Sequence, residues 1–174
     1  MARRLTLAAH CLLDPLSRPP GLAAPPRPDI DGPVYQLPCP ELSYLGPRRW
    51  EVSREQLDFP GYRRHCHELA LRVAEDVANL VAGGTLVVRL LGVPQSPSCA
   101  AETTTVGYAG GRVRIAGDSS SGASEDTRPG HLEHRHVSGE GVFVEELARQ
   151  LSAAGVSFQA ADAVSGECAG PGKA

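Results

Sequence analysis

The sequence has no long hydrophobic run, no surplus of basic residues and no closely spaced pair of cysteines. None of its apolar segments approaches the roughly 18 residues that a membrane-spanning helix needs. Lysine and arginine number 17 and aspartate and glutamate 20, so the net charge of −3 argues against binding nucleic acid through a basic surface. We therefore expect neither a membrane span nor a nucleic-acid polymer as partner.

The five cysteines are spread along the chain without a CxxC motif. An odd number cannot all pair with one another, and secreted disulfide scaffolds are shorter and richer in cysteine. The apolar stretch at the start is interrupted at His10 and Asp14, which makes it too short for the core of a signal peptide. We expect a cytoplasmic protein whose cysteines are buried thiols or ligands that the fold brings together.

The length of 174 residues, with 41% hydrophobic and 21% charged residues, is sufficient for a buried core. We expect a single α/β domain over residues 1–164 and a frayed tail over residues 165–174. The 19 glycines and 15 prolines predict many turns and several long loops.

Apolar periodicity divides the chain into strands and helices. Short apolar segments predict four strands: 4–13, 34–38, 85–92 and 156–160. Apolar residues at steps of three and four, with glycine at the end, predict two helices: 61–82 and 140–154. Loops are expected at 15–33, 43–60 and 117–131, and a weak strand or hairpin at 103–116. This order predicts a small Rossmann-like parallel sheet covered by helices, with long loops rich in proline and glycine.

Three cysteines follow predicted strands, namely Cys11, Cys39 and Cys99. Because ligands of open parallel sheets bind at the carboxyl ends of the strands, these thiols can converge although they lie far apart in sequence. Three thiolates suit a soft metal or an iron–sulfur cluster. A [4Fe–4S] cluster with three cysteine ligands leaves one iron open to water or substrate.

Cys66 is a possible fourth ligand in the predicted first turn of the helix 61–82. A closed site with four ligands, holding zinc or a sealed cluster, would make the chain a non-catalytic metal-binding module. An open position would instead favour an enzyme. Cys168, in the glycine-rich tail, is expected to be inert.

The segments around the three strand-end cysteines resemble a known family. Three short motifs carry the resemblance: Cys11-Leu12-Leu13, Cys39-Pro40-Glu41 and Ser96-Pro97-Ser98-Cys99. In this order they are similar to motifs of the 2-thiouracil desulfurases, small bacterial domains also called TudS-like proteins. Residues 38–50, together with residues 60–66, resemble a divergent branch of desulfidases, and residues 139–156 are similar to the C-terminal half of the family.

The resemblance implies a [4Fe–4S] cluster held by the three strand-end cysteines. It also implies hydrolytic C–S cleavage, in which a small thiocarbonyl compound such as a thiolated nucleobase exchanges sulfur for oxygen and sulfide is released. Three residues beside the cysteines are the candidates for moving protons or orienting the substrate: Glu41, Ser96 and Ser98. Their alternative roles are structural, with Glu41 as a cap and the serines as partners of backbone groups around Pro97.

The chain also departs from the family pattern. Ala100 follows the last motif where the family usually has glycine, and the arginine–tyrosine–aspartate–glycine run after the first cysteine is absent.

Other polar clusters have simple interpretations. We expect an exposed histidine cluster rather than a zinc site at His131, His134 and His136. A solvated face, rather than an anion site, is expected for Arg48, Arg49, Arg63 and Arg64. Packing roles are expected for Tyr44 and Trp50.

Overall fold

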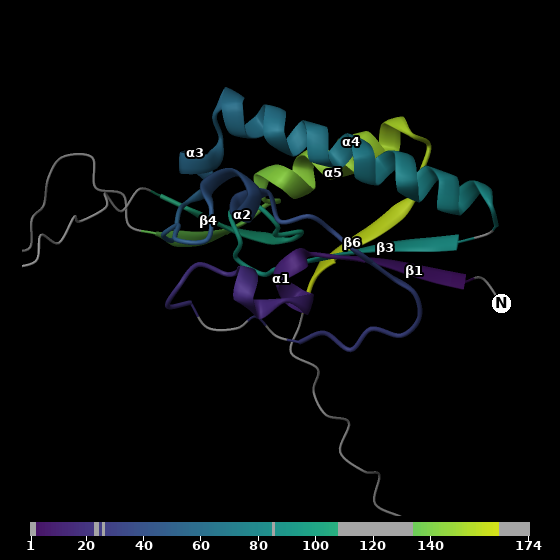
Figure 1. Ribbon diagram of the computed structural model, residues 1–174, viewed down its shortest axis with the longest axis horizontal. Helices are drawn as coiled ribbons and strands as arrows, with labels where there is room; N and C mark the ends of the chain where they lie inside the picture. Colours follow the sequence, from purple (N-terminus) through teal and green to yellow (C-terminus); the bar gives the residue numbers. More distant parts are fainter. Residues whose placement is uncertain (1–2, 23–24, 26, 85, 108–133, 164–174) are drawn as a thin grey trace, which may run out of the picture.

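The structure is a computed structural model that describes residues 3–22, 25, 27–84, 86–107 and 134–163. Its centre is a parallel sheet of four strands in the order β2-β1-β3-β6. The strands are β1 (Arg3–Ala8), β2 (Val34–Gln36), β3 (Leu86–Gly92) and β6 (Phe158–Asp162). Figure 1 shows this sheet flanked by helices, so the predicted α/β class is confirmed.

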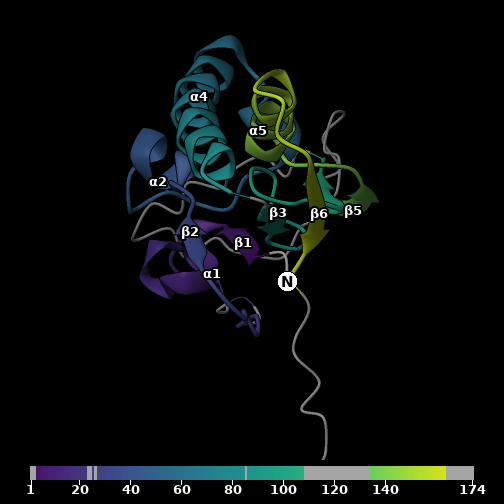
Figure 2. The ribbon, with the colours of Figure 1, turned by 90° about the vertical axis from the view of Figure 1, so that its right-hand side faces the viewer.

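Two long helices cover one face of the sheet. They are α4 (Pro60–Ala82) and α5 (Val142–Ala153), which pack against each other (Figure 2). The other face carries the short helix α1 (His10–Leu13) and the 3₁₀ turn η1 (Pro15–Ser17). No helix in the described part of the chain has both the length and the apolar character that crossing a bilayer requires.

The core lies between the sheet and the two long helices. Leu5 and Leu7 of β1 and Val88 and Leu90 of β3 are buried, as expected for central strands of a parallel sheet that is covered on both faces. The helix α4 buries one stripe of side chains at three- and four-residue steps: Tyr62, Cys66, Ala70, Val73, Ala74 and Val77. Apolar periodicity therefore predicts this helix and part of its buried face, since Val73 and Val77 are buried but Leu80 at the same spacing is 47% exposed.

Two short helices replace part of the irregular segment expected over 43–60. They are α2 (Pro40–Leu45) and α3 (Arg54–Leu57). Cys39 is the N-cap of α2 and Pro40 its first residue, while at α3 the Gln56 side chain accepts from the backbone N–H of the N-cap residue Ser53 at 2.8 Å. The expectation of loop was wrong here because each helix is too short to show apolar periodicity, although each carries a capping signal.

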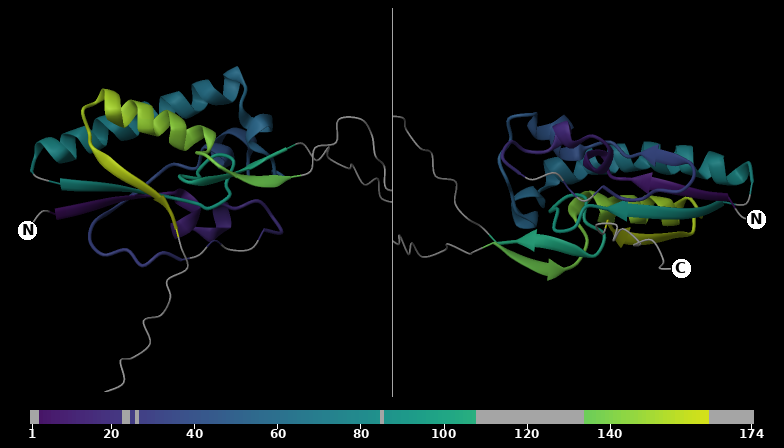
Figure 3. Two further views of the ribbon diagram at one scale, coloured as in Figure 1. Left: turned by 180° about the vertical axis from the view of Figure 1, so that it is seen from behind. Right: turned by 90° about the horizontal axis from the view of Figure 1, so that it is seen from below.

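The strand ends also differ from the prediction. The first strand ends at Ala8, so Cys11 lies in α1, and the last strand begins at Phe158 instead of Val156. The strand β4 (Thr103–Val106) falls within the weak strand expected over 103–116, but β5 (Arg135–Ser138), with which it pairs antiparallel, was not predicted. Figure 3 shows this two-stranded sheet beyond the carboxyl ends of the parallel strands. The expected loop over 117–131 and the tail over 165–174 lie outside the described residues.

Candidate functional site

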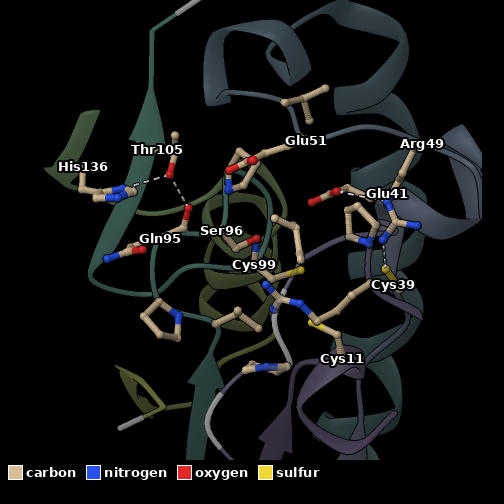
Figure 4. A pocket seen from close by; sticks show the side chains of 18 residues that line it. Cys11, Cys39, Glu41, Arg49, Glu51, Gln95, Ser96, Cys99, Thr105 and His136 are labelled. Carbon is tan, nitrogen blue, oxygen red and sulfur yellow. Dashed lines mark hydrogen bonds and ion pairs between the residues drawn. The ribbon is translucent and has the colours of Figure 1, made fainter. Parts of the chain in front are cut away.

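The strand order creates a topological switch point beside β1. The chain passes from β1 to β2 on one side and then crosses to β3 on the other side. Ligands of open α/β sheets bind at the carboxyl ends of the strands at such a point. A cavity of about 350 Å³ is found there, and three cysteines line it: Cys11, Cys39 and Cys99 (Figure 4).

Each of these cysteines is held by a different local structure. Cys11 lies in α1, which starts two residues after β1. The Sγ atom of Cys39 caps α2 by accepting a hydrogen bond from the backbone N–H of Leu42 at 3.4 Å. Cys99 lies in the loop after β3, where its carbonyl accepts from the backbone N–H of Val93 at 2.9 Å. The fold thus brings together three residues from three separate strand ends.

Burial and mutual repulsion control the protonation of these thiols. Burial, with a smaller contribution from the charge of Cys39, raises the pKa of Cys11 to about 11. The pKa of Cys39 is raised by burial, and the pKa of the fully buried Cys99 lies well above its usual value for the same reason, with help from the other two sulfurs. Without a cation, the three groups are therefore protonated thiols near neutral pH, and a metal centre would displace their protons.

The donor set has the chemistry that iron–sulfur clusters use, namely thiolates. Among the described residues, no three His, Cys, Asp or Glu side chains lie close enough together to hold a single metal ion. In a [4Fe–4S] cluster each cysteine binds a different iron, so the sulfurs need not meet at one point. The three thiols that line the cavity are donors of the chemical type that such a cluster takes.

Glu41 lies in the first turn of α2 and lines the same cavity. Its Oε2 atom accepts a hydrogen bond from Nε of Arg49 at 3.2 Å. Burial raises the pKa of the Glu41 carboxyl, while the Arg49 guanidinium opposes the increase. The structure therefore places a buried carboxyl group, fixed by a cation, in the wall that holds the cysteines.

Arg49 is itself buried, with 6% of its surface exposed, so the expectation of a solvated residue was wrong. Its guanidinium donates to the backbone carbonyls of Gly46 at 3.2 Å and Ser17 at 2.5 Å. It also approaches Sγ of Cys39 at 3.9 Å. Arg49 thereby ties the cavity wall to η1 and α2, a role that its neighbour Arg48, which is exposed, does not share.

The two candidate serines have different environments. Ser96 lines the cavity, and its Oγ accepts hydrogen bonds from the backbone N–H groups of Ser98 at 3.3 Å and Cys99 at 2.9 Å. Because Ser96 accepts both bonds, its own hydroxyl proton stays available for a ligand. Ser98 does not line the cavity: it is fully buried, lies 2.8 Å from the Tyr62 hydroxyl and accepts from Sγ of Cys99 at 3.7 Å. It is placed to position Cys99.

The N-terminus of α5 closes over the loop that carries Cys99. The backbone N–H groups of Phe143 and Val144 donate to the Ser98 carbonyl at 2.9 and 3.2 Å. A Cβ atom at Gly141 would lie 2.3 Å from the carbonyl carbon of Ser98, so a larger residue cannot fit without displacing the loop. The approach of α5 therefore requires glycine and fixes the backbone just before Cys99.

Several functional residues escaped sequence reasoning. Asp162, at the end of β6, accepts from the backbone N–H groups of residues 101–103 and so fixes the chain after Cys99. Its position at the carboxyl end of a strand is the feature of the sequence from which it could have been predicted. His136 is exposed, as expected, but it also forms part of the cavity wall. Arg18 lies in this wall too, and its Nε atom is buried without a hydrogen-bond partner among the described residues.

The remaining candidates lie elsewhere or outside the described residues. Cys66 is buried in the second turn of α4, not the first, and does not line the cavity. Trp50 is 71% exposed, so its expected packing role was wrong. Arg63 is paired with Asp58 and with Glu145 of α5. His131 and Cys168 lie outside the described residues.

Comparisons with known proteins give no independent assignment. No protein-family model, no curated protein and no solved structure matches this chain. The resemblance to 2-thiouracil desulfurases stays a prediction that rests on three motifs, whose cysteines line one cavity.

Proposed function

We propose that this chain is an iron–sulfur-dependent desulfurase that hydrolyses the C=S bond of a small thiocarbonyl compound, of the thiolated-nucleobase type, and releases sulfide. The observation that carries the proposal is that the three strand-end cysteines line one cavity together with Glu41 and Ser96. Cys11, Cys39 and Cys99 would hold a [4Fe–4S] cluster. When bound, such a cluster supplies an iron with an open coordination position that can polarise the C=S bond.

The cavity supports a small substrate. Its volume of about 350 Å³ lies near the lower end of the range of roughly 300–1,000 Å³ for small-molecule sites. Prolines form part of its wall, and a few polar side chains, among them Glu41 and Ser96, line it as well (Figure 4). Such a mixture is typical of sites that orient one small ligand. A single thiolated ring is a ligand of this size.

The reaction requires groups of the chain that transfer protons and orient the substrate. A thiocarbonyl and water give a carbonyl and hydrogen sulfide, so both protons of the water end on sulfur. Glu41 is a carboxyl group in the cavity wall that can carry these protons, and Arg49 holds it in place at 3.2 Å. The free hydroxyl proton of Ser96 can donate a hydrogen bond that orients the substrate.

The placement of Cys66 bears on the alternative of a closed, non-catalytic metal module. A closed site needs a fourth ligand, and Cys66 was the sequence candidate. Cys66 is absent from the described lining of the cavity and is buried in α4 with Tyr62. Three cysteines in the lining favour a site with an open position, which is what an enzyme requires.

The proposal is tested by anaerobic purification with iron and acid-labile sulfide counted per chain, followed by sulfide release from 2-thiouracil. We expect about four irons per chain and a carbonyl product in step with the sulfide. Cys66→Ala serves as the matched control that keeps the cluster. A protein that takes up one zinc ion and no iron under reconstitution would instead favour the non-catalytic module.

A further inference from the structure

The side of the cavity opposite Cys11 and Cys39 is formed by a chain of three hydrogen-bonded residues, Gln95, Thr105 and His136 (Figure 4). Thr105 of β4 and His136 of β5 are direct cross-strand neighbours, and Gln95 lies in the turn after β3. The Oγ1 atom of Thr105 donates to the carbonyl of Gln95 at 2.7 Å and lies 3.0 Å from Nδ1 of His136.

These contacts assign the proton of the imidazole. The Gln95 carbonyl can only accept, so the single hydroxyl proton of Thr105 is used for that bond. Thr105 must then accept from His136, which requires a proton on Nδ1. In the neutral ring Nε2 therefore carries a lone pair. Among the described residues, Nε2 of His136 has no hydrogen-bond partner.

The backbone at Gln95 is held in an unusual conformation. Its φ angle of 65° is the only positive φ of a non-glycine residue in the described part of the chain. Two hydrogen bonds from β4 hold it: the Thr103 carbonyl accepts from the Gln95 N–H at 2.8 Å, and Thr105 donates to the Gln95 carbonyl. Strained backbone of this kind clusters at ligand sites, and here it fixes the carbonyl that determines the direction of the Thr105 hydroxyl.

We propose that Thr105 holds His136 as the Nδ1-protonated imidazole, so that Nε2 accepts a hydrogen bond from an N–H group of the substrate. His136 is then a specificity residue, and Thr105 positions it. The inference rests on the proposed desulfurase function and narrows its substrate class to thiocarbonyl compounds with an N–H donor, such as thioamides and cyclic thioureas. A compound without that donor would not gain the hydrogen bond to Nε2.

The first test measures which ring nitrogen of His136 carries the proton. It uses ¹⁵N–¹H correlation spectra of the histidine side chains, recorded at a pH at which the imidazole is neutral. His136→Phe identifies the signal by removing it. We expect the Nδ1–H form in the wild type and in Thr105→Ser, which keeps the hydroxyl. Thr105→Val, which lacks it, should lose the preference for Nδ1–H. A wild-type ring protonated on Nε2, or a Thr105→Val spectrum identical to the wild type, would overturn the inference.

The second test compares the binding of 2-thiouracil with that of its N1,N3-dimethyl derivative to the cluster-loaded protein. The wild type should prefer 2-thiouracil, and His136→Phe should reduce that preference about 3- to 10-fold, the size of one net hydrogen bond. An unchanged preference in a His136→Phe protein that still releases sulfide overturns the inference and leaves the desulfurase function intact. If the wild type carries no cluster and binds neither compound, the proposed function fails and the inference fails with it.

Discussion

Replacing Arg49 with methionine should destabilise the protein in a way that depends on pH. The guanidinium of Arg49 is buried and makes four contacts: with the Glu41 carboxylate, two backbone carbonyls and Sγ of Cys39. The side chains of Arg49 and Glu41 are only 4% and 11% exposed, so solvent cannot replace the lost partner. Breaking a buried pair by removing one member typically lowers the free energy of unfolding by about 3–5 kcal/mol.

The pH dependence follows from the pKa of Glu41. Burial raises that pKa above its ordinary value of 4.5, and Arg49 opposes the increase. In Arg49→Met the pKa must therefore rise further. A group whose pKa is raised by folding contributes stability below its unfolded pKa and loses it as pH rises through the folded pKa. The deficit of Arg49→Met should consequently be larger at about pH 8 than at about pH 5.

Urea unfolding at these two pH values, with equal iron content in every sample, measures the effect. Arg48→Met is the matched control, because Arg48 is exposed and adjacent, and its change should stay within about 0.5 kcal/mol. The double variant Arg49→Met with Glu41→Gln should lose the pH dependence, since no unpaired carboxylate remains. A deficit that equals that of Arg48→Met, or one that is the same at both pH values, would refute the reasoning.

Three further predictions concern the cavity. Serine in place of Cys11, Cys39 or Cys99 should sharply reduce the iron content measured after anaerobic purification. Cys66→Ala should keep the iron and lower the free energy of unfolding by on the order of 1 kcal/mol through lost packing. Full iron content in any of the three serine variants contradicts this ligand set. Glu41→Gln should keep the cluster but reduce sulfide release from 2-thiouracil on the order of 10²-fold, and near-normal turnover would reduce Glu41 to a structural residue. Gly141→Ala should lower the free energy of unfolding by roughly 1–3 kcal/mol, because the new Cβ would overlap Ser98. Gly84→Ala, where a Cβ meets nothing within 4 Å, is the control, and equal stability of the two variants would argue against the close approach of α5.

Local sequence patterns were enough to predict the elements that frame the site. The helix α4 shows three- and four-residue apolar steps and begins and ends at proline and glycine signals, so it could be predicted almost to the residue. The strand β3 is an apolar run between Gly84 and Pro94, while β1 has no breaker near its end, so its predicted end lay beyond Ala8. Because parallel strands present their carboxyl ends at one edge, the placement of Cys11, Cys39 and Cys99 after strands also predicted that they line one cavity.

Side-chain environments could not be predicted in the same way. Arg48 and Arg49 are adjacent and chemically identical, yet one is exposed and the other is buried against Glu41. The difference depends on η1, whose Ser17 carbonyl accepts from Arg49 although it lies far away in sequence. Burial of a charged group depends on which distant segment covers it, and a local pattern carries no record of that segment.

The sequence by itself thus determined the parallel sheet, its two long helices and the edge at which the cysteines gather, because these depend on periodicity and on the ends of strands. Only the tertiary structure decided how the cavity is completed. It placed His136 of β5 across from the cysteines, brought α5 onto the backbone of Ser98 and buried Arg49 against the Ser17 carbonyl of η1. Each of these contacts joins segments that are remote in the chain, so packing in three dimensions, and not local propensity, selects them.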